Sequence, residues 1–336
     1  MRGDISQARS GLTRSGPRSE WVASRYVDVR SVLDDERFQV AKVDRYGRFG
    51  TIHWLRASVS RFADGQEHRR RRAIVERELA SLPPAGMRDG AHRRTALFLR
   101  GPARRVDVMA TLARRVPMAT MASALGIDDE EKAAGAVAAI AAGYFPGCGV
   151  EAERRADEAT ALLIELLEPA DEELVAARIA LMVQGCDAIA GLIGNTLHLI
   201  QDAPQLATHP THALLCEVVR HRPPVRASRR VARVEVQIEG RHIPAGDPVV
   251  CSIDAANHDP EAFDRPERFD PLRRGPASLT FGHGIRPCPG SEHAMMLAAA
   301  VIDAVRERCV LLPGAPVPYE PSPALRIPER LEVEVR

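Results

Sequence analysis

The chain has 336 residues, a formal net charge of +1, 45% hydrophobic residues and 27% charged residues. These values are typical of a globular protein with a large core, and they give no reason to expect nucleic acid or an anionic membrane as partner. The six cysteines are scattered without paired spacing, the N-terminus lacks the apolar part of a signal peptide, and no apolar run reaches the roughly 20 residues that span a bilayer. We therefore expect a soluble, cytoplasmic protein without disulfides.

The first sixty residues predict a strand and a helix, followed by a stretch without periodicity. Residues 20–24 have strand character, and a short helix begins at Tyr26. The loop-rich residues 39–62 contain His53 and Trp54. An aromatic side chain beside a histidine favours the wall of a ligand pocket, and a mobile surface loop is the alternative.

The next predicted helix carries two cationic side chains on one face. Asp64 is placed to cap its N-terminus, and His68 and Arg72 stand at positions i and i+4. Such a pair suits a carboxylate ligand. Arg69 and Arg71 fall on other faces, where they indicate either a solvated surface or a docking site for an acidic protein.

The middle of the chain predicts several helices, of which one is long and buried. A helix is expected over residues 106–126, and two amphipathic helices over 130–144 and 151–167 are joined by a turn-rich stretch that begins at Phe145. The last helix of this series covers residues 171–200. It is apolar along most of its length, which is typical of a central helix.

The most specific motif is the glycine-rich loop over residues 281–290, which presents one sulfur, Cys288, and then opens an apolar helix. Glycines suit a backbone with positive φ or one that passes close to a bulky flat partner. A thiolate is stabilised at a helix N-terminus. From the residues, Cys288 is an inert buried thiol, a zinc ligand together with His283 and His293, or the axial ligand of a heme iron. A full zinc ligand set at standard spacing is lacking.

This loop resembles the heme-binding loop of the cytochrome P450 family, F-x-x-G-x-R/H-x-C-x-G, with every position filled. The resemblance extends over about residues 20–336. The chain resembles the soluble bacterial members of the family, but it looks shorter than they are at the N-terminus and between the G and I helices. It implies a mainly α protein with small β-sheets, and a single domain over residues 1–336. The implied parts are an N-terminal sheet and B/B–C region over 1–60, lid helices over 130–168, the I helix over 171–200, and the K helix to the heme-binding loop over 214–290.

The resemblance implies heme b (iron protoporphyrin IX) as cofactor, held between the I helix and the Cys loop with its L helix. Cys288 would then be the metal ligand. The positions that match the family's other cofactor-binding residues are His68, Arg72, Arg230 and Arg286 for the propionates, and Phe281, Gly282 and Gly290 in the loop.

The family pattern [A/G]-G-x-[D/E]-T is only partly kept on the I helix. Gly185 would make room for oxygen and Asp187 would help to deliver protons, as the resemblance implies. Ala188 stands where the family has threonine, and Gln184 stands one turn earlier in place of a small residue. The lost hydroxyl is a lost proton donor, which makes oxidative coupling of aromatic groups an alternative to hydroxylation.

Two further sets of residues are implied by the resemblance. A buried structural network would join Glu217 and Arg220, an E-x-x-R pair on a helix, to Arg268 downstream. The substrate pocket would be lined by His53, Trp54, Tyr144 and Phe145.

The sequence therefore predicts a P450 monooxygenase or oxidase that activates O₂. Its expected substrate is a small molecule or a short peptide, a secondary-metabolite or peptide precursor that is either hydroxylated or cross-linked through Tyr, Trp or His-type side chains. A separate ferredoxin and ferredoxin reductase would supply electrons. The rival hypothesis is that the chain is a catalytically degenerate relative that acts in binding or recruitment. Ala188 is one observation that supports this hypothesis.

Overall fold

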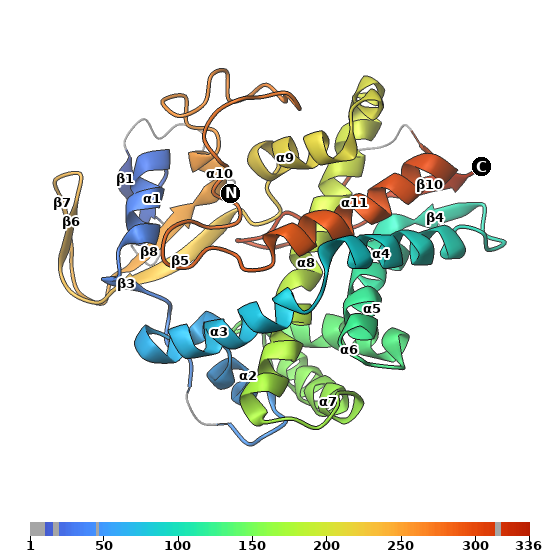
Figure 1. Cartoon of the computed structure of the whole chain (residues 1–336). Coiled ribbons are helices and arrows are strands. Elements are labelled where there is room, and N and C mark those ends of the chain that lie inside the picture. Colours follow the sequence, from blue (N-terminus) through green and yellow to red (C-terminus); the bar gives the residue numbers. More distant parts are fainter. Residues whose placement is uncertain (1–10, 16–19, 45–46, 313–316) are drawn as a thin grey trace. The chain divides into compact units, whose positions relative to one another are not determined.

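The computed structural model describes residues 11–15, 20–44, 47–312 and 317–336. The protein is mainly helical with small sheets, as the sequence predicts. Its residues form two compact units (Figure 1). The first unit combines the N-terminal residues to Ala41 with Ala213–Cys288 and Pro321–Arg326, and the second combines Lys42–His212, Pro289–Glu320 and Ile327–Arg336. The single domain expected over residues 1–336 stays a prediction.

The first unit is built on a five-stranded sheet in the order β1-β2-β8-β5-β3. Strand β2 runs parallel to β8, and the other neighbours are antiparallel. The strands are β1 (Leu12–Ser15), β2 (Glu20–Ala23), β3 (Phe38–Gln39), β5 (Ala227–Ala232) and β8 (Pro248–Ser252). A hairpin of β6 (Val236–Ile238) and β7 (Arg241–Ile243) turns at Glu239 and Gly240, both with positive φ. Such a turn matches the twist of the two strands.

The helices of the first unit complete its core. Helix α1 (Tyr26–Asp34) and helix α10 (Ile253–Ala256) pack with the sheet, and their apolar side chains join one buried cluster that includes Val29, Phe38 and Val249. Burial of this kind supplies the main driving force for folding. The strand and helix expected from residue 20 onward are thus present. Helix α9 (Thr211–His221) precedes β5.

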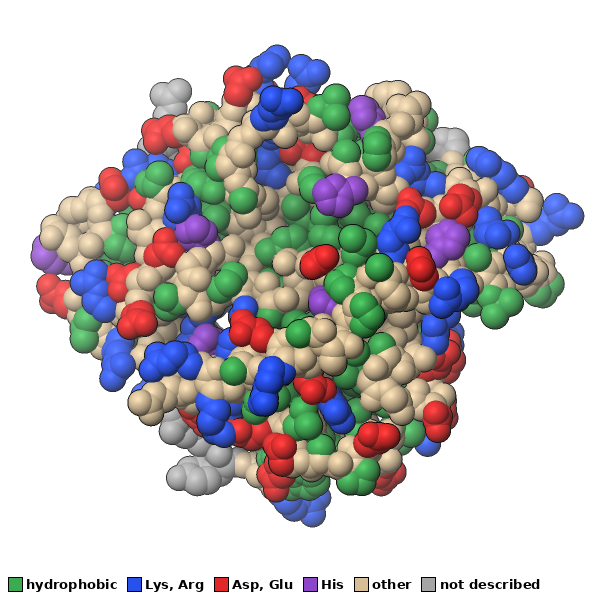
Figure 2. Space-filling view, in the orientation of Figure 1, with side chains coloured by type: hydrophobic (Ala, Val, Ile, Leu, Met, Phe, Trp, Pro, Cys, Tyr) green, Lys and Arg blue, Asp and Glu red, His purple; other side chains and the backbone are tan. Residues whose placement is uncertain are grey.

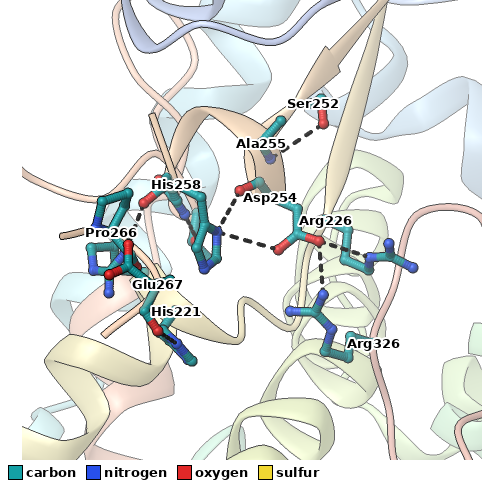
Figure 3. A network of polar contacts seen from close by, with 12 residues as sticks. His221, Arg226, Ser252, Asp254, Ala255, His258, Pro266, Glu267 and Arg326 are labelled. Atoms are coloured by element: carbon teal, nitrogen blue, oxygen red, sulfur yellow. Dashed lines mark hydrogen bonds and ion pairs between the residues drawn. The ribbon is translucent and has the colours of Figure 1, made fainter. Parts of the chain in front are cut away.

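A network of ion pairs and hydrogen bonds joins residues 321–326 to the residues at the ends of β5 and β8 (Figure 3). Asp254 accepts a hydrogen bond from Arg326 Nη2 at 2.7 Å, and Arg226 Nε lies 3.4 Å from the same carboxylate oxygen. His258 Nδ1 lies 2.8 Å from the carbonyl oxygen of Asp254. Backbone bonds from Arg226 to Ala324 and from Arg326 to the carbonyl of residue 224 run beside these contacts. Ion pairs and backbone hydrogen bonds therefore both hold residues 321–326 in place.

The second unit is organised around α8 (Glu172–Asp202), a helix of 31 residues. Asp171 caps it by accepting bonds from the N–H groups of Glu173 and Leu174. The helices around it are α2 (Ile52–Ser58), α3 (Gly65–Ala80), α4 (Pro84–Phe98), α5 (Arg115–Ala124), α6 (Glu130–Gly143), α7 (Val150–Leu166) and α11 (Ser291–Arg308) (Figure 1). Short helical turns cover Ser60–Phe62, Met109–Ala113 and Pro204–Thr208. By length and composition α8 could cross a membrane, but 67% of its most apolar stretch is buried inside the protein.

The helix predicted over residues 106–126 is wrong at its start. Arg105–Asp107 form strand β4, which pairs with β10 (Glu332–Val335), and β10 also pairs with β9 (Cys309–Leu311). A π-helical turn follows at Met109–Ala113, and the α-helix begins only at Arg115. The strand depends on a partner more than two hundred residues away, which no local pattern reveals. On the face seen in Figure 2, acidic and basic side chains are intermixed, in keeping with the small net charge.

Candidate functional site

The Cys288 loop is closed by its own backbone and by α1. The N–H of Cys288 donates to the carbonyl of Phe281 at 2.7 Å, and Gly282 and Gly284 have φ values of +76° and +65°. A Cβ at Gly284 would lie 1.9 Å from Asp34 Oδ1 and 2.8 Å from Asp34 Cα, so only glycine fits there. Cys288 itself is exposed at the end of the first unit.

The histidines beside the loop have structural partners. His283 Nε2 lies 3.2 Å from Asp34 Oδ2 and accepts a bond from Arg30 Nε at 3.0 Å, which ties the loop to α1. His293 is buried on α11, where its Nε2 lies 2.7 Å from the carbonyl oxygen of Leu82. Among the described residues, no group of three His, Cys, Asp or Glu side chains could hold a metal ion. The described residues therefore give no support to the zinc interpretation.

The buried-thiol interpretation does not describe Cys288, because Cys288 is exposed whereas Cys251 and Cys186 are buried. Burial raises the pKa of each of these two thiols to about 12, which is typical of a thiol that stays protonated. No disulfide joins the six cysteines. Gly290, expected to need a special backbone, has φ −101° at the N-cap of α11, and a Cβ there would meet only Leu79 at 3.9 Å.

The four residues assigned to the propionates fall on both units. In the first unit, Arg230 is buried on β5 and its Nη1 donates to Ser228 Oγ at 2.7 Å, and Arg286 is half-buried in the Cys288 loop. In the second unit, His68 and Arg72 are both half-buried on α3, and Arg72 Nε lies 2.7 Å from Glu76 Oε1. The role of these side chains toward heme stays a prediction.

The other cationic residues of α3 differ from one another in their surroundings. Arg71 Nη1 donates to the carbonyl of Ala57 at 2.6 Å, and Arg71 Nε lies 3.3 Å from Glu173 Oε1. Arg71 therefore joins α3 to α2 and α8, and neither interpretation from the sequence describes it. Arg69 is exposed. Asp64 stands at the N-cap position, but its side chain makes no capping hydrogen bond.

The oxygen-site motif lies where the buried pattern of α8 is interrupted. Gln184 is exposed, and Gly185, Asp187 and Ala188 are half-buried, between the buried residues Val183 and Ile189. A Cβ at Gly185 would lie 3.3 Å from Ile189 Cδ1, the flexible end of a side chain, and 3.7 Å from Met118 Cε. A side chain at Gly185 would therefore fit only if the Ile189 side chain shifted slightly, so the protein atoms alone do not demand a glycine.

Asp187 is held by a residue that sequence analysis missed. Arg114 Nε donates to Asp187 Oδ1 at 2.8 Å, and Arg114 Nη2 lies 2.7 and 2.8 Å from the two carboxylate oxygens of Glu320. Burial lowers the pKa of Arg114, but the hydrogen bonds that it donates to both carboxylates raise its pKa above the ordinary value. The three residues are far apart in the chain, and none of the motifs links them.

The structural network contains a different second arginine from the one predicted. Arg220 donates two hydrogen bonds to the Glu217 carboxylate, at 2.9 and 2.6 Å, and both side chains are buried. Arg273 Nε is the third member, 3.0 Å from Glu217 Oε1. Arg268 contributes only its carbonyl oxygen, which accepts from Arg220 and Arg273, and its side chain is exposed. The assignment of Arg268 to the side-chain network is therefore wrong.

The residues predicted for the substrate pocket have unequal exposure. Trp54 is buried and its Nε1 donates to Glu172 Oε2 at 3.2 Å. Tyr144 is buried, Phe145 is exposed, and their rings meet edge to face at 5.6 Å. His53 lines a cavity of about 260 Å³ together with Lys42, Val43, Asp44, Arg56, Pro146, Gly147 and Glu153.

Arg56 fixes the turn between α6 and α7 and was also missed. Its side chain is 3% exposed and donates to the carbonyls of Gly143, Tyr144 and Phe145 at 2.6, 3.0 and 3.3 Å. Its Nη1 donates to Glu153 Oε1 at 2.8 Å. Guanidinium groups suit this task because their donors point in several fixed directions. Arg56 thereby attaches α2 to the end of α6 and the start of α7.

The sequence profile of the cytochrome P450 family matches residues 165–332, half of the chain. The chain belongs to this family and is a cytochrome P450 monooxygenase.

Particular relatives support the same conclusion over nearly the full length. The chain is 28% identical to the cytochrome P450 monooxygenase PikC of Streptomyces venezuelae, over 91% of this chain and 83% of that protein. It is 27% identical to the biflaviolin synthase CYP158A1 of Streptomyces coelicolor, over 88% and 80%. Substrate-free CYP109E1 from Bacillus megaterium has the same fold, with a TM-score of 0.83 at 22% identity over 98% of this chain and 96% of that one.

The family implies heme, and the residues of each unit fit it. In the first unit, the exposed Cys288 on a loop closed by its own backbone is a suitable metal ligand, and Arg230 and Arg286 supply guanidinium groups for carboxylates. In the second unit, Arg72 supplies a guanidinium group and His68 an imidazole. A heme bound through a cysteine thiolate supplies the chemistry of O₂ activation.

Proposed function

We propose that this P450 monooxygenase hydroxylates a C–H bond of a secondary-metabolite precursor. The reaction takes up O₂, two electrons and two protons, inserts one oxygen atom into the substrate and releases the other as water. The observation that carries this proposal is the Cys288 loop, in which a backbone bond to Phe281 and an obligatory Gly284 present an exposed sulfur. The similarity to PikC, which is a cytochrome P450 monooxygenase, supports the same class of reaction.

Within this proposal, heme b is the cofactor and Cys288 is its ligand. Asp187 is the acid that moves protons toward the position beside Gly185, because Ala188 offers no hydroxyl for this task. Electrons come from a separate ferredoxin and its reductase, as bacterial members of the family use redox partners, and the protein acts in the cytoplasm. Trp54, Tyr144 and Phe145 belong to the substrate-binding region that Arg56 holds together.

The test of the heme–thiolate assignment is the absorption spectrum of the reduced protein with carbon monoxide. The wild-type protein should show the thiolate-shifted band, and Cys288→Ser should lose that band. Cys216→Ser is the matched control, because Cys216 is also an exposed cysteine of the first unit and lies on α9 outside the loop. A thiolate-shifted band that survives Cys288→Ser would refute the assignment. A wild-type protein that binds no heme would favour the degenerate binding or recruitment protein.

A second candidate reaction is oxidative cross-linking of aromatic groups, in which the substrate loses two hydrogens and gains no oxygen. Ala188 favours it, since the position that the family fills with threonine lacks a proton donor. The relative named biflaviolin synthase supports it more distantly. A screen for spin-state shifts with small molecules and short aromatic peptides would find ligands. The product mass then separates the reactions, by a gain of one oxygen or a loss of two hydrogens.

A further inference from the structure

Arg114 is shared by two carboxylates, one on α8 and one in the C-terminal segment. Its Nε donates to Asp187 Oδ1 at 2.8 Å, and its Nη2 is 2.7 and 2.8 Å from Glu320 Oε1 and Oε2. The three side chains are between 24% and 33% exposed. One positive charge therefore faces two negative charges in a site that is partly shielded from water.

Glu320 is held in place without help from Asp187. Its N–H donates to the carbonyl of Ile327 at 2.9 Å, and the preceding residue, Tyr319, forms an isolated bridge with Pro328. The Tyr319 hydroxyl is also 3.1 Å from His198 Nδ1 on α8. The Glu320 carboxylate is thus a fixed counter-ion for Arg114, anchored by backbone bonds and by a second contact to α8.

This arrangement lowers the cost of moving Asp187. Removing the only partner of a partly buried charge is expensive, because the remaining charge is left uncompensated. With Glu320 present, Asp187 can leave Arg114 while Nη2 of the guanidinium keeps its contacts to both oxygens of the Glu320 carboxylate. With Glu320 neutralised, the full charge of Arg114 would act on Asp187 alone and hold it more tightly.

We infer that Glu320 is a positioning residue that keeps Arg114 paired, so that Asp187 can leave and return to the guanidinium as it carries protons. The inference rests on the proposed function, in which Asp187 takes a proton from solvent onto its carboxylate and passes it toward the position beside Gly185. Ala188 makes this mobility important, because the neighbouring side chain cannot relay the proton instead.

The test uses the heme-loaded full chain, driven by NADPH with a surrogate ferredoxin and its reductase. Glu320→Gln should slow NADPH oxidation by about tenfold, part of the roughly 10²- to 10⁴-fold that a positioned proton donor contributes. The same variant should raise the solvent isotope effect, and Glu320→Asp should restore both. In an Arg114→Gln background, Glu320→Gln should have no further effect. Arg115→Gln is the matched control, because Arg115 forms an exposed pair with Glu131 next to this site.

A second readout does not depend on turnover. The loss of Tm caused by Asp187→Asn should be larger in the Glu320→Gln background than in the wild-type background, because Arg114 then has no other counter-ion. Equal losses of Tm in the two backgrounds, or an equal slowing by Glu320→Gln with and without Arg114, would overturn the inference. The proposed function fails separately, since its proton role for Asp187 is refuted if Asp187→Asn leaves the turnover rate and isotope effect unchanged.

Discussion

Two substitutions can show whether Arg273 or Arg268 is the second arginine that stabilises the Glu217 network. Arg273→Ala removes the bond from Nε to Glu217 Oε1 and three bonds to the carbonyls of Asp264, Arg265 and Arg268. Glu217 keeps Arg220 as a bidentate partner, so the loss is smaller than that of the whole network. Hydrogen bonds that involve a charged group contribute about 1.5–3 kcal/mol each. We expect Arg273→Ala to destabilise the protein by about 3 kcal/mol.

Arg268→Ala is the matched control for this prediction. Its side chain is exposed and only its carbonyl oxygen takes part in the network, so the free energy of unfolding should change by less than about 0.5 kcal/mol. The measurement is denaturant unfolding of the heme-loaded variants, followed by tryptophan fluorescence and by heme absorbance. A large loss for Arg268→Ala together with a small loss for Arg273→Ala would refute the reasoning and restore the assignment made from the sequence.

Glu217→Ala should be the most severe change in the same network. It leaves the guanidinium of Arg220, whose side chain is 3% exposed, without its carboxylate, and removing one partner of a buried pair costs about 3–5 kcal/mol. We expect little heme-loaded protein from this variant, and normal loading would contradict the structural role of Glu217. Gly284→Ala should prevent the Cys288 loop from closing against Asp34, seen as weak heme retention. Gly290→Ala should retain heme, because Gly290 has a negative φ and a Cβ there would make only an ordinary contact with Leu79. Tyr144→Phe should be neutral or stabilising by up to about 1 kcal/mol, since the buried hydroxyl has no hydrogen-bond partner among the described residues. Burial raises the pKa of Tyr144 in the folded state, so the unfolded state loses its phenolic proton first as pH rises. The wild-type protein should therefore lose stability above the ordinary tyrosine pKa of about 10, and the variant should lose less.

The sequence predicts those parts of the protein whose physical cause is local. Helix α8 and the glycine-rich loop carry their patterns within a few residues, namely a long apolar run after Asp171 and the spacing from Phe281 to Gly290. The pair of Glu217 and Arg220 lies within one helical turn, so its spacing is also visible. These elements are present where they were expected.

The parts that sequence analysis missed depend on contacts between distant segments. Strand β4 forms because β10 offers it backbone partners, and the apolar residues around Val106 alone favoured a helix. Arg273 follows Arg268 in an irregular stretch without periodicity, so no pattern shows which of the two side chains turns toward Glu217. No sequence pattern near Asp187, Arg114 or Glu320 indicates that these three side chains contact one another.

Arg56, Arg114 and Arg220 show why so many contacts between distant segments involve arginine. Each joins segments that are remote in sequence, and each binds a carboxylate with one part of its guanidinium and other acceptors with the rest. A buried lysine could not reach several acceptors in fixed directions, because its ammonium is a compact point charge. Sequence composition shows 46 cationic residues, but it does not show which of them are buried cross-links and which are solvated. That distinction depends on where carbonyl and carboxylate oxygens converge, which is a property of the folded chain.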